Sequence, residues 1–129
     1  MGVPCAWPSR FPMRTLLPLR VALALPEDRR ERFIHRTFRA YWAEDRDLAE
    51  PEVIGALLDE LGEPRSWLLR AAEPDVKQRL VDETEAAAAA GAFGAPTFRA
   101  RGWEHEPPFW GQDRVELLEL ALSRPGGLG

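Results

Sequence analysis

Residues 91–98 read Gly91-Ala92-Phe93-Gly94-Ala95-Pro96-Thr97-Phe98, and residues 109–114 read Phe109-Trp110-Gly111-Gln112-Asp113-Arg114. The first run predicts that a long helix ends at Gly91 and that a glycine-rich bend leads into a short strand over residues 97–101. The second run predicts another short strand at residues 109–110 and a last helix that Gly111 opens. Together the two runs predict a hairpin followed by a helix.

Pro96 stands where the first of these strands begins. Proline has no backbone N–H, so this position indicates either a sheet edge or a cis peptide bond. A cis Ala95–Pro96 bond would turn the backbone of Ala95 outward, where it is free to pair with the main chain of a ligand. In the second run, the first N–H groups of the last helix lack partners and attract a carboxylate. Asp113 can accept hydrogen bonds from an amine, or it can be a plain helix cap.

The bulk composition is that of one modest domain. The chain has 129 residues, 45% hydrophobic and 29% charged, with a formal net charge of -4, which argues against a general nucleic-acid binder. No apolar run approaches the length of a membrane span, and three early prolines interrupt any signal-peptide pattern. We therefore expect a cytoplasmic protein with no nucleic-acid or membrane partner.

The cysteine and histidine content limits the chemistry. The single cysteine, Cys5, excludes an internal disulfide, a CxxC redox pair and a cysteine-based zinc site. Cys5 is interpreted as a small apolar filler rather than a reactive thiol, because nothing beside it would lower the pKa of the thiol. His35 and His105 lie far apart, and the Glu104-His105-Glu106 cluster falls on a turn, so we expect no metal site.

Helices fill the chain before Gly91. Apolar spacing predicts a helix over residues 15–25 with Leu16, Leu19 and Ala22 inward, and a second after Pro26. The second helix carries an apolar stripe at i, i+4, i+7 and i+8, formed by Ile34, Phe38, Tyr41 and Trp42, and an arginine-rich face that we expect to pair with local acids. Three further helices start at the Glu-Pro pairs 50–51, 63–64 and 73–74.

The two quoted runs resemble the family of 2-hydroxychromene-2-carboxylate isomerases and kappa-class glutathione transferases, which are DsbA-like proteins. The resemblance extends upstream through Gly2-Val3-Pro4, Phe11-Pro12, Thr15 and Arg20. It implies a mainly α fold with a small β-hairpin, made of a helical subdomain and the C-terminal ββα half of a thioredoxin-like α/β fold. We expect one partial DsbA-like domain over residues 1–129, with a helical insertion subdomain at 13–91 and the thioredoxin half at 92–123.

The resemblance also implies a ligand, glutathione. In that family glutathione lies against the residue before the cis-proline, and its γ-glutamyl end meets the segment that matches Gln112 and Asp113. The expected glutathione-binding residues are therefore Ala95, Pro96, Gly111, Gln112 and Asp113. A carboxylate, an amine and a peptide amide in a row, which these residues suit, describe the γ-glutamyl-cysteinyl part of glutathione.

The family's catalytic serine has no counterpart here. That serine lies at the end of the first strand, and this chain starts inside what matches the family's helical insertion; Ser9, Ser66 and Ser123 do not match the active position. No catalytic residue is carried over. The first strand, first helix and second strand of the fold also have no counterpart, and a lone two-stranded hairpin is marginal. Three explanations stay open: a second copy completes the sheet, the true product is longer, or the chain is a remnant.

The leading prediction is a glutathione-dependent isomerase or transferase type of protein, incomplete and inactive alone, that acts on a small aromatic substrate once completed. The reaction would be cis–trans isomerisation of an aromatic pyruvate, or conjugation. The second prediction is a non-enzymatic interaction module that forms a homodimer or joins a complementing chain through exposed sheet edges. A DsbA-like thiol oxidoreductase is disfavoured by the absence of CxxC.

Overall fold

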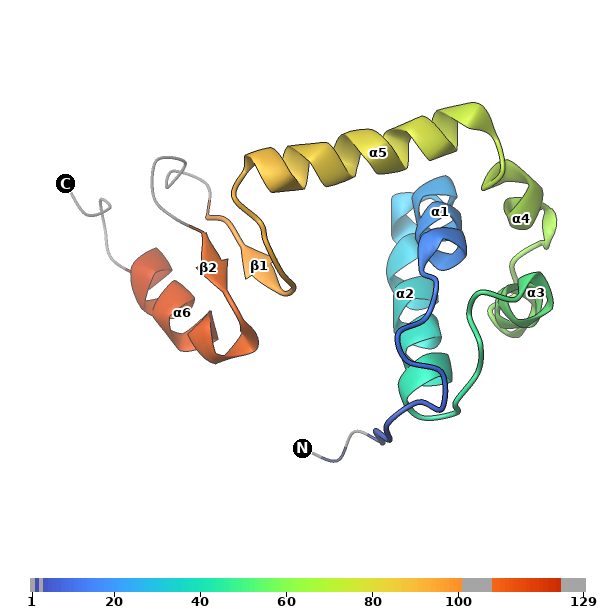
Figure 1. Cartoon of the computed structure of the whole chain (residues 1–129), viewed down its shortest axis with the longest axis horizontal. Helices are drawn as coiled ribbons and strands as arrows, with labels where there is room; N and C mark the ends of the chain where they lie inside the picture. Colours follow the sequence, from blue (N-terminus) through green and yellow to red (C-terminus); the bar gives the residue numbers. More distant parts are fainter. Residues whose placement is uncertain (1, 3, 101–107, 124–129) are drawn as a thin grey trace. The chain divides into compact units, whose positions relative to one another are not determined.

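The computed structural model describes residues 2, 4–100 and 108–123 (Figure 1). The described residues are mainly helical and contain one small two-stranded antiparallel sheet, as predicted. In chain order the elements are α1 (Leu16–Ala24), α2 (Glu27–Trp42), α3 (Pro51–Glu60), α4 (Ser66–Arg70), α5 (Pro74–Ala89), β1 (Thr97–Phe98), β2 (Phe109–Trp110), the 3-10 turn η1 (Gln112–Arg114) and α6 (Val115–Ser123).

The chain forms two compact units, Met1–Val81 (unit 1) and Asp82–Gly129 (unit 2). The division falls inside α5. Unit 1 holds α1 to α4 and the start of α5, while unit 2 holds the rest of α5, the hairpin and α6.

The core of unit 1 lies between α1, α2, α3 and α4. Its largest fully buried side chains are Val21, Leu25, Phe33, Ile54, Leu57 and Leu58. Each such aliphatic or aromatic side chain stabilises the fold by about 1.5–3 kcal/mol through burial. No helix in the described part of the chain is long and apolar enough to cross a membrane.

The buried stripe of α2 is offset by one residue from the predicted one. The core side chains are Phe33, Thr37, Ala40 and Tyr41, whereas Ile34 is 36% and Phe38 59% exposed. Both sets have the i, i+4, i+7, i+8 spacing, so periodicity alone does not separate them. The Thr37 hydroxyl donates a hydrogen bond of 2.7 Å to the Ile34 carbonyl oxygen, which lets this polar side chain lie inside.

The orientation of α1 also differs from the prediction. Val21 and Ala22 are buried as expected, but Leu16 is 55% and Leu19 46% exposed. The buried face of α1 runs through Pro18 instead. The α1 prediction failed because Leu16 and Leu19 fit an apolar stripe as well as Pro18 does, and only contact with neighbouring helices distinguishes the two faces.

Proline sets the start of two of the three helices predicted at Glu-Pro pairs, whereas α4 begins at Ser66 and not at Pro64. α3 and α5 begin at Pro51 and Pro74. α3 is followed by Gly62 with φ 73° and α5 by Gly91 with φ 87°, and both glycines stand in the left-handed region that suits a helix C-terminus. The N–H group of the residue after each glycine then bonds back to the helix, at 2.9 Å from Glu63 to Leu58 and 3.0 Å from Ala92 to Ala87.

The N-terminal segment lies along the C-terminal part of α2. The Tyr41 hydroxyl donates a hydrogen bond of 2.7 Å to the Arg10 carbonyl oxygen, and the Ala6 amide donates one of 2.7 Å to the Trp42 carbonyl oxygen. Cys5 is exposed, so its interpretation as an apolar filler was wrong. Hydrogen bonds and aromatic contacts hold the segment against α2, so its packing does not depend on burial of the Cys5 thiol.

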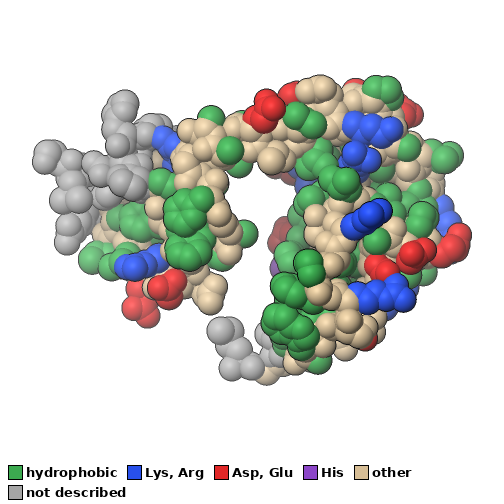
Figure 2. All heavy atoms as spheres, viewed as in Figure 1, with side chains coloured by type: hydrophobic (Ala, Val, Ile, Leu, Met, Phe, Trp, Pro, Cys, Tyr) green, Lys and Arg blue, Asp and Glu red, His purple; other side chains and the backbone are tan. Residues whose placement is uncertain are grey.

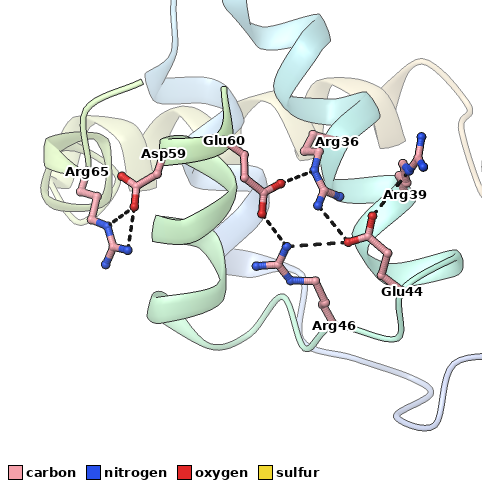
Figure 3. A network of polar contacts seen from close by, with 7 residues as sticks. All are labelled: Arg36, Arg39, Glu44, Arg46, Asp59, Glu60 and Arg65. Atoms are coloured by element: carbon pink, nitrogen blue, oxygen red, sulfur yellow. Dashed lines mark hydrogen bonds and ion pairs between the residues drawn. The ribbon is translucent and has the colours of Figure 1, made fainter. Parts of the chain in front are cut away.

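A network of ion pairs joins α2, α3 and the segment between them (Figure 3). Arg36 donates to Glu60 at 2.7 Å and to Glu44 at 2.8 Å, and Arg46 donates to Glu60 at 2.9 Å. The hydrogen bond from Arg46, followed by that from Arg36, holds the pKa of Glu60 below its usual value, and the bond from Arg36 does the same for Glu44. Arg36 on the basic face of α2 thus pairs with nearby acids, as predicted.

In unit 2, β1 and β2 are antiparallel, with Thr97 opposite Trp110 and Phe98 opposite Phe109. The strand predicted over residues 97–101 ends at Phe98. Its last residue, the predicted Glu104-His105-Glu106 turn and the predicted tail after Ser123 lie outside the described residues.

Burial along α6 departs from the sequence prediction. Ala121 is buried and Leu118 half-buried, but Val115 is 37% and Leu122 60% exposed, although the apolar spacing of Val115, Leu118 and Leu122 predicts that all three face inward. The hairpin ladder in the described residues spans two residues per strand, and such a surface is too short to cover a nine-residue helix.

Candidate functional site

The bend at Pro96 and the turn at Gly111 are joined directly. The Gly111 amide donates a hydrogen bond of 3.0 Å to the Pro96 carbonyl oxygen, one residue beyond the β1–β2 ladder. The Ala95–Pro96 peptide bond is cis. Two segments that are more than a dozen residues apart in sequence are therefore brought to the same end of the hairpin.

The main chain of Ala95 is available to a ligand. Ala95 is exposed, and its N–H and C=O groups make no hydrogen bond to any residue that the structure describes. An extended peptide can add to such a free edge by main-chain hydrogen bonds. Ligand binding at Ala95 stays a prediction.

The bend is shaped by an aromatic pair. The rings of Phe93 and Trp110 lie 5.1 Å apart between centroids, and a Cβ atom at Gly94 would lie 2.4 Å from Nε1 of Trp110. Only glycine leaves room for the indole there. The sequence analysis did not assign Phe93, Gly94 or Trp110 to the site. The sequence feature that could have identified them is an aromatic residue on each side of a glycine-rich bend.

The second predicted segment forms a glycine turn and a short 3-10 turn. Gly111 has φ 102° and ψ 149°, a conformation that is essentially confined to glycine. A Cβ there would lie 2.3 Å from Oδ1 of Asp113, so the Asp113 carboxylate folds back over Gly111. The first N–H groups of this turn, at Gln112 and Asp113, precede the helical hydrogen-bond ladder.

Asp113 is exposed and has one charged neighbour. Its Oδ2 lies 3.6 Å from Nε of Arg114, so the two neighbouring residues form an ion pair. The carboxylate makes no capping hydrogen bond within the described part of unit 2. Its lone pairs are therefore open to a ligand amine, and the choice between this role and a plain helix cap stays a prediction.

Unit 1 contains an apolar pocket that the sequence did not predict. Its volume is about 410 Å³, and it lies between α1, α2 and the N-terminal segment. The side chains that form most of its wall are Phe11, Met13, Leu19, Ile34, Phe38 and Tyr41. The signal was present in the sequence as the second apolar stripe of α2, which faces this pocket instead of the core.

The three serines lie in the N-terminal segment, at the start of α4 and at the end of α6. Ser9 and Ser66 belong to unit 1, and Ser123 ends α6 with its hydroxyl donating to the Leu120 carbonyl oxygen. Within residues 2, 4–100 and 108–123, no three His, Cys, Asp or Glu side chains group as metal ligands. Hydrophobic side chains gather on the face of unit 2 seen in Figure 2.

A family model for the DSBA-like thioredoxin domain matches residues 1–123. The chain belongs to the DsbA-like thioredoxin-domain family. The hairpin, the proline bend and the final helix described above thus lie within the residues that match this family. The family and the fold class inferred from the sequence are both confirmed.

Two individual proteins sharpen the comparison. The chain is 36% identical over 86 residues to human glutathione S-transferase kappa 1, a match that covers 64% of this chain and 38% of that protein. It superposes on the structure of a 2-hydroxychromene-2-carboxylate isomerase with a TM-score of 0.76 at 23% identity, over 95% of this chain and 59% of that one. The chain thus spans well under two thirds of each of these proteins.

Proposed function

We propose that this protein binds glutathione and acts in a glutathione-dependent isomerase or transferase reaction. The observation that carries the proposal is the hydrogen bond from Gly111 to Pro96, which brings the free backbone of Ala95 and the Gly111–Asp113 turn to one end of the hairpin. The similarity to a kappa-class glutathione transferase supports the choice of ligand.

The expected binding mode uses main-chain groups first. The N–H and C=O of Ala95 pair with the cysteinyl residue of glutathione, as an added strand does. The γ-glutamyl carboxylate lies against the N–H groups of Gln112 and Asp113, where unpaired amides favour an anion. The Asp113 carboxylate accepts hydrogen bonds from the α-amine, and these charge-assisted bonds are the stronger kind.

Catalysis needs a further group near the sulfur. None of Ser9, Ser66 and Ser123 is assigned to the thiolate, so the proposal assigns activity to a form of the protein that includes the thiolate-stabilising group. In that state the reaction would be cis–trans isomerisation of an aromatic pyruvate, or conjugation.

The proposed co-substrate is a small aromatic compound. The apolar pocket of unit 1, with its volume of about 410 Å³, falls in the range of about 300–1,000 Å³ typical of small-molecule sites. Its wall of aromatic and aliphatic side chains suits an aromatic ring. We place the protein in the cytoplasm.

Calorimetric titration with reduced glutathione tests the binding proposal. We expect Asp113→Ala to weaken binding by about tenfold, because one charged hydrogen bond is lost. Glu116→Ala is the matched control: it removes an exposed carboxylate three residues further along and should leave binding unchanged. Absence of binding in the wild-type chain, or equal binding by both variants, would refute the assignment.

A second candidate function is a non-enzymatic interaction module. It is favoured by the exposed apolar surface of unit 2, where Phe93 is 76%, Trp110 50% and Leu120 51% exposed, beside a sheet of only two strands in the described residues. Sedimentation velocity over a range of protein concentrations tests it. A concentration-independent monomer would count against self-association.

A thiol oxidoreductase, the third candidate, has no CxxC pair to work with, since Cys5 is the one cysteine in the sequence. A disulfide-exchange assay with Cys5→Ser decides the matter. Only loss of a measurable activity in that variant would revive the idea.

A further inference from the structure

A second pocket in unit 1 is lined by cations and by no carboxylate. It lies where α1, α4 and the start of α5 meet, with a volume of about 340 Å³. Three basic side chains line it, Arg14, Arg20 and Lys77, and the rest of its wall is leucine and alanine. An unbalanced positive charge over an apolar floor is the complement of an amphiphilic anion.

Arg20 is the polar centre of this pocket. Its Nε atom is buried and has no hydrogen-bond partner among the described residues. Buried guanidinium donors in folded proteins are nearly always satisfied by protein groups or by water, so Nε of Arg20 is open to a hydrogen bond with a group from outside the chain. The planar fork of arginine matches the two oxygens of a carboxylate or phosphate.

The acids closest in sequence to Lys77 are already engaged. Glu73 accepts a hydrogen bond of 2.9 Å from Arg70, and Asp75 accepts one of 2.6 Å from the same guanidinium. The hydrogen bonds from Arg70 lower the pKa of Asp75 to about 2. These two acids are therefore not free to neutralise the pocket.

The apolar wall determines the chemical character and the size of the part of the ligand that lies beyond its anionic head. Leu17 and Leu68 are packed against the core and Ala71 is 1% exposed, so this wall is well fixed. The cavity volume equals about eleven water molecules at ~30 Å³ each, which is room for an organic molecule of roughly that many heavy atoms.

We propose that this pocket binds a small organic anion, whose carboxylate or phosphate head pairs with Arg20 and whose short apolar tail lies on Leu17, Leu68 and Ala71. Arg14 and Lys77, both exposed, add attraction at the rim. The pocket is made entirely by unit 1, and so it is separate from the glutathione site proposed in unit 2.

Calorimetric titration of the full chain with octanoate tests the proposal, with inorganic phosphate as the head alone and octan-1-ol as the tail alone. Octanoate should bind about tenfold more tightly than either, and added salt should weaken it. Equal affinity for octanoate and octan-1-ol would mean that the pocket binds through apolar contact alone, and this result would overturn the proposal. The absence of any octanoate binding would overturn it as well.

Variants then assign the head group. Arg20→Met keeps an unbranched stem and should weaken octanoate binding by about tenfold. Lys77→Met, at an exposed position where folding is not at risk, should weaken it by about threefold. The matched control is Arg32→Met, an exposed arginine of α2 that does not line this pocket; it should change binding by less than about twofold.

One result separates this site from the proposed function. Asp113→Ala should leave octanoate binding unchanged while it weakens glutathione binding by about tenfold. If Arg20→Met does not fold, Lys77→Met alone decides. Unchanged octanoate affinity in a folded Arg20→Met variant, or in Lys77→Met, would contradict the assignment.

Discussion

The amide of Gly111 donates a hydrogen bond of 3.0 Å to the carbonyl oxygen of Pro96. This bond extends the two-residue ladder of the hairpin. It also holds the bend at Pro96 next to the turn at Gly111, which are separate runs in the sequence. The N–H and C=O groups of Ala95 make no hydrogen bond to any of the described residues. The candidate ligand site of this DsbA-like chain depends on that arrangement.

Gly111→Ala tests whether the turn needs glycine. Alanine at φ 102° and ψ 149° is expected to cost about 1–3 kcal/mol of hairpin stability, and glutathione binding should weaken as the turn shifts. Amide hydrogen exchange at the hairpin measures the first effect and calorimetry the second. Gly2→Ala, where a Cβ has no atom within 4 Å, should behave as wild type. Equal protection in Gly111→Ala and wild type would disprove the argument.

Gly94→Ala tests the packing of the bend. The new Cβ would lie 2.4 Å from Nε1 of Trp110, so the indole must move, at a cost of about 1–3 kcal/mol for an overpacked contact. The ¹H–¹⁵N signal of the Trp110 indole should shift markedly. The indole signals of Trp7, Trp42 and Trp67, which belong to unit 1, provide the internal control. An unmoved Trp110 signal would show that the contact is not made.

Leu57→Ala tests the core of unit 1. Leu57 is 0% exposed, and its truncation leaves a cavity that is expected to cost about 2–5 kcal/mol. Leu69, 75% exposed on α4, supplies the same substitution without burial, so Leu69→Ala should change the unfolding free energy by less than about 0.5 kcal/mol. Urea titration measures both. Similar losses in the two variants would mean that the core is wrongly placed.

Glu60→Gln tests the ion-pair network of Figure 3. The pKa of Glu60 is held below its usual 4.5 by hydrogen bonds from Arg46 and Arg36, so its stabilisation is present above that pH and is lost as the pH falls through the lowered pKa. Glu60 is 42% exposed, and solvent screening limits the contribution to about 0.5–1 kcal/mol.

Urea unfolding at neutral pH and again below the lowered pKa gives the comparison. The variant should be less stable than wild type at neutral pH and equal to it in acid. Glu31→Gln, which removes an exposed carboxylate from the same basic helix, should show little difference at either pH. A Glu60→Gln deficit that persists undiminished in acid would have another origin.

Helix starts and ends were predicted from the backbone preferences of proline and glycine. Pro51 and Pro74 start helices, and Gly62 and Gly91 end them, because proline and glycine impose backbone angles that neighbours do not override. The Gly111 turn was predictable for the same reason. These signals, with the resemblance of the two quoted runs, led to the family.

Side-chain burial was predicted less well, and α2 shows why. Phe33 and Ile34 begin two stripes of identical spacing, and only contact with other helices decides which is inside. The orphaned Nε of Arg20 is likewise a tertiary property, since it depends on which acids pair elsewhere. Ala95 stood out in the sequence only because a proline follows it.

The most direct test of the central claim follows the backbone amides of Ala95, Gly111, Gln112 and Asp113 by NMR while reduced glutathione is added. The account predicts saturable shifts at Ala95, Gln112 and Asp113 in the wild-type chain. The shifts at Ala95 and Gln112 should need about tenfold more glutathione to saturate in Asp113→Ala and should be unchanged in Glu116→Ala. Saturating glutathione that leaves these amides unmoved, or that moves only amides of unit 1, would contradict it.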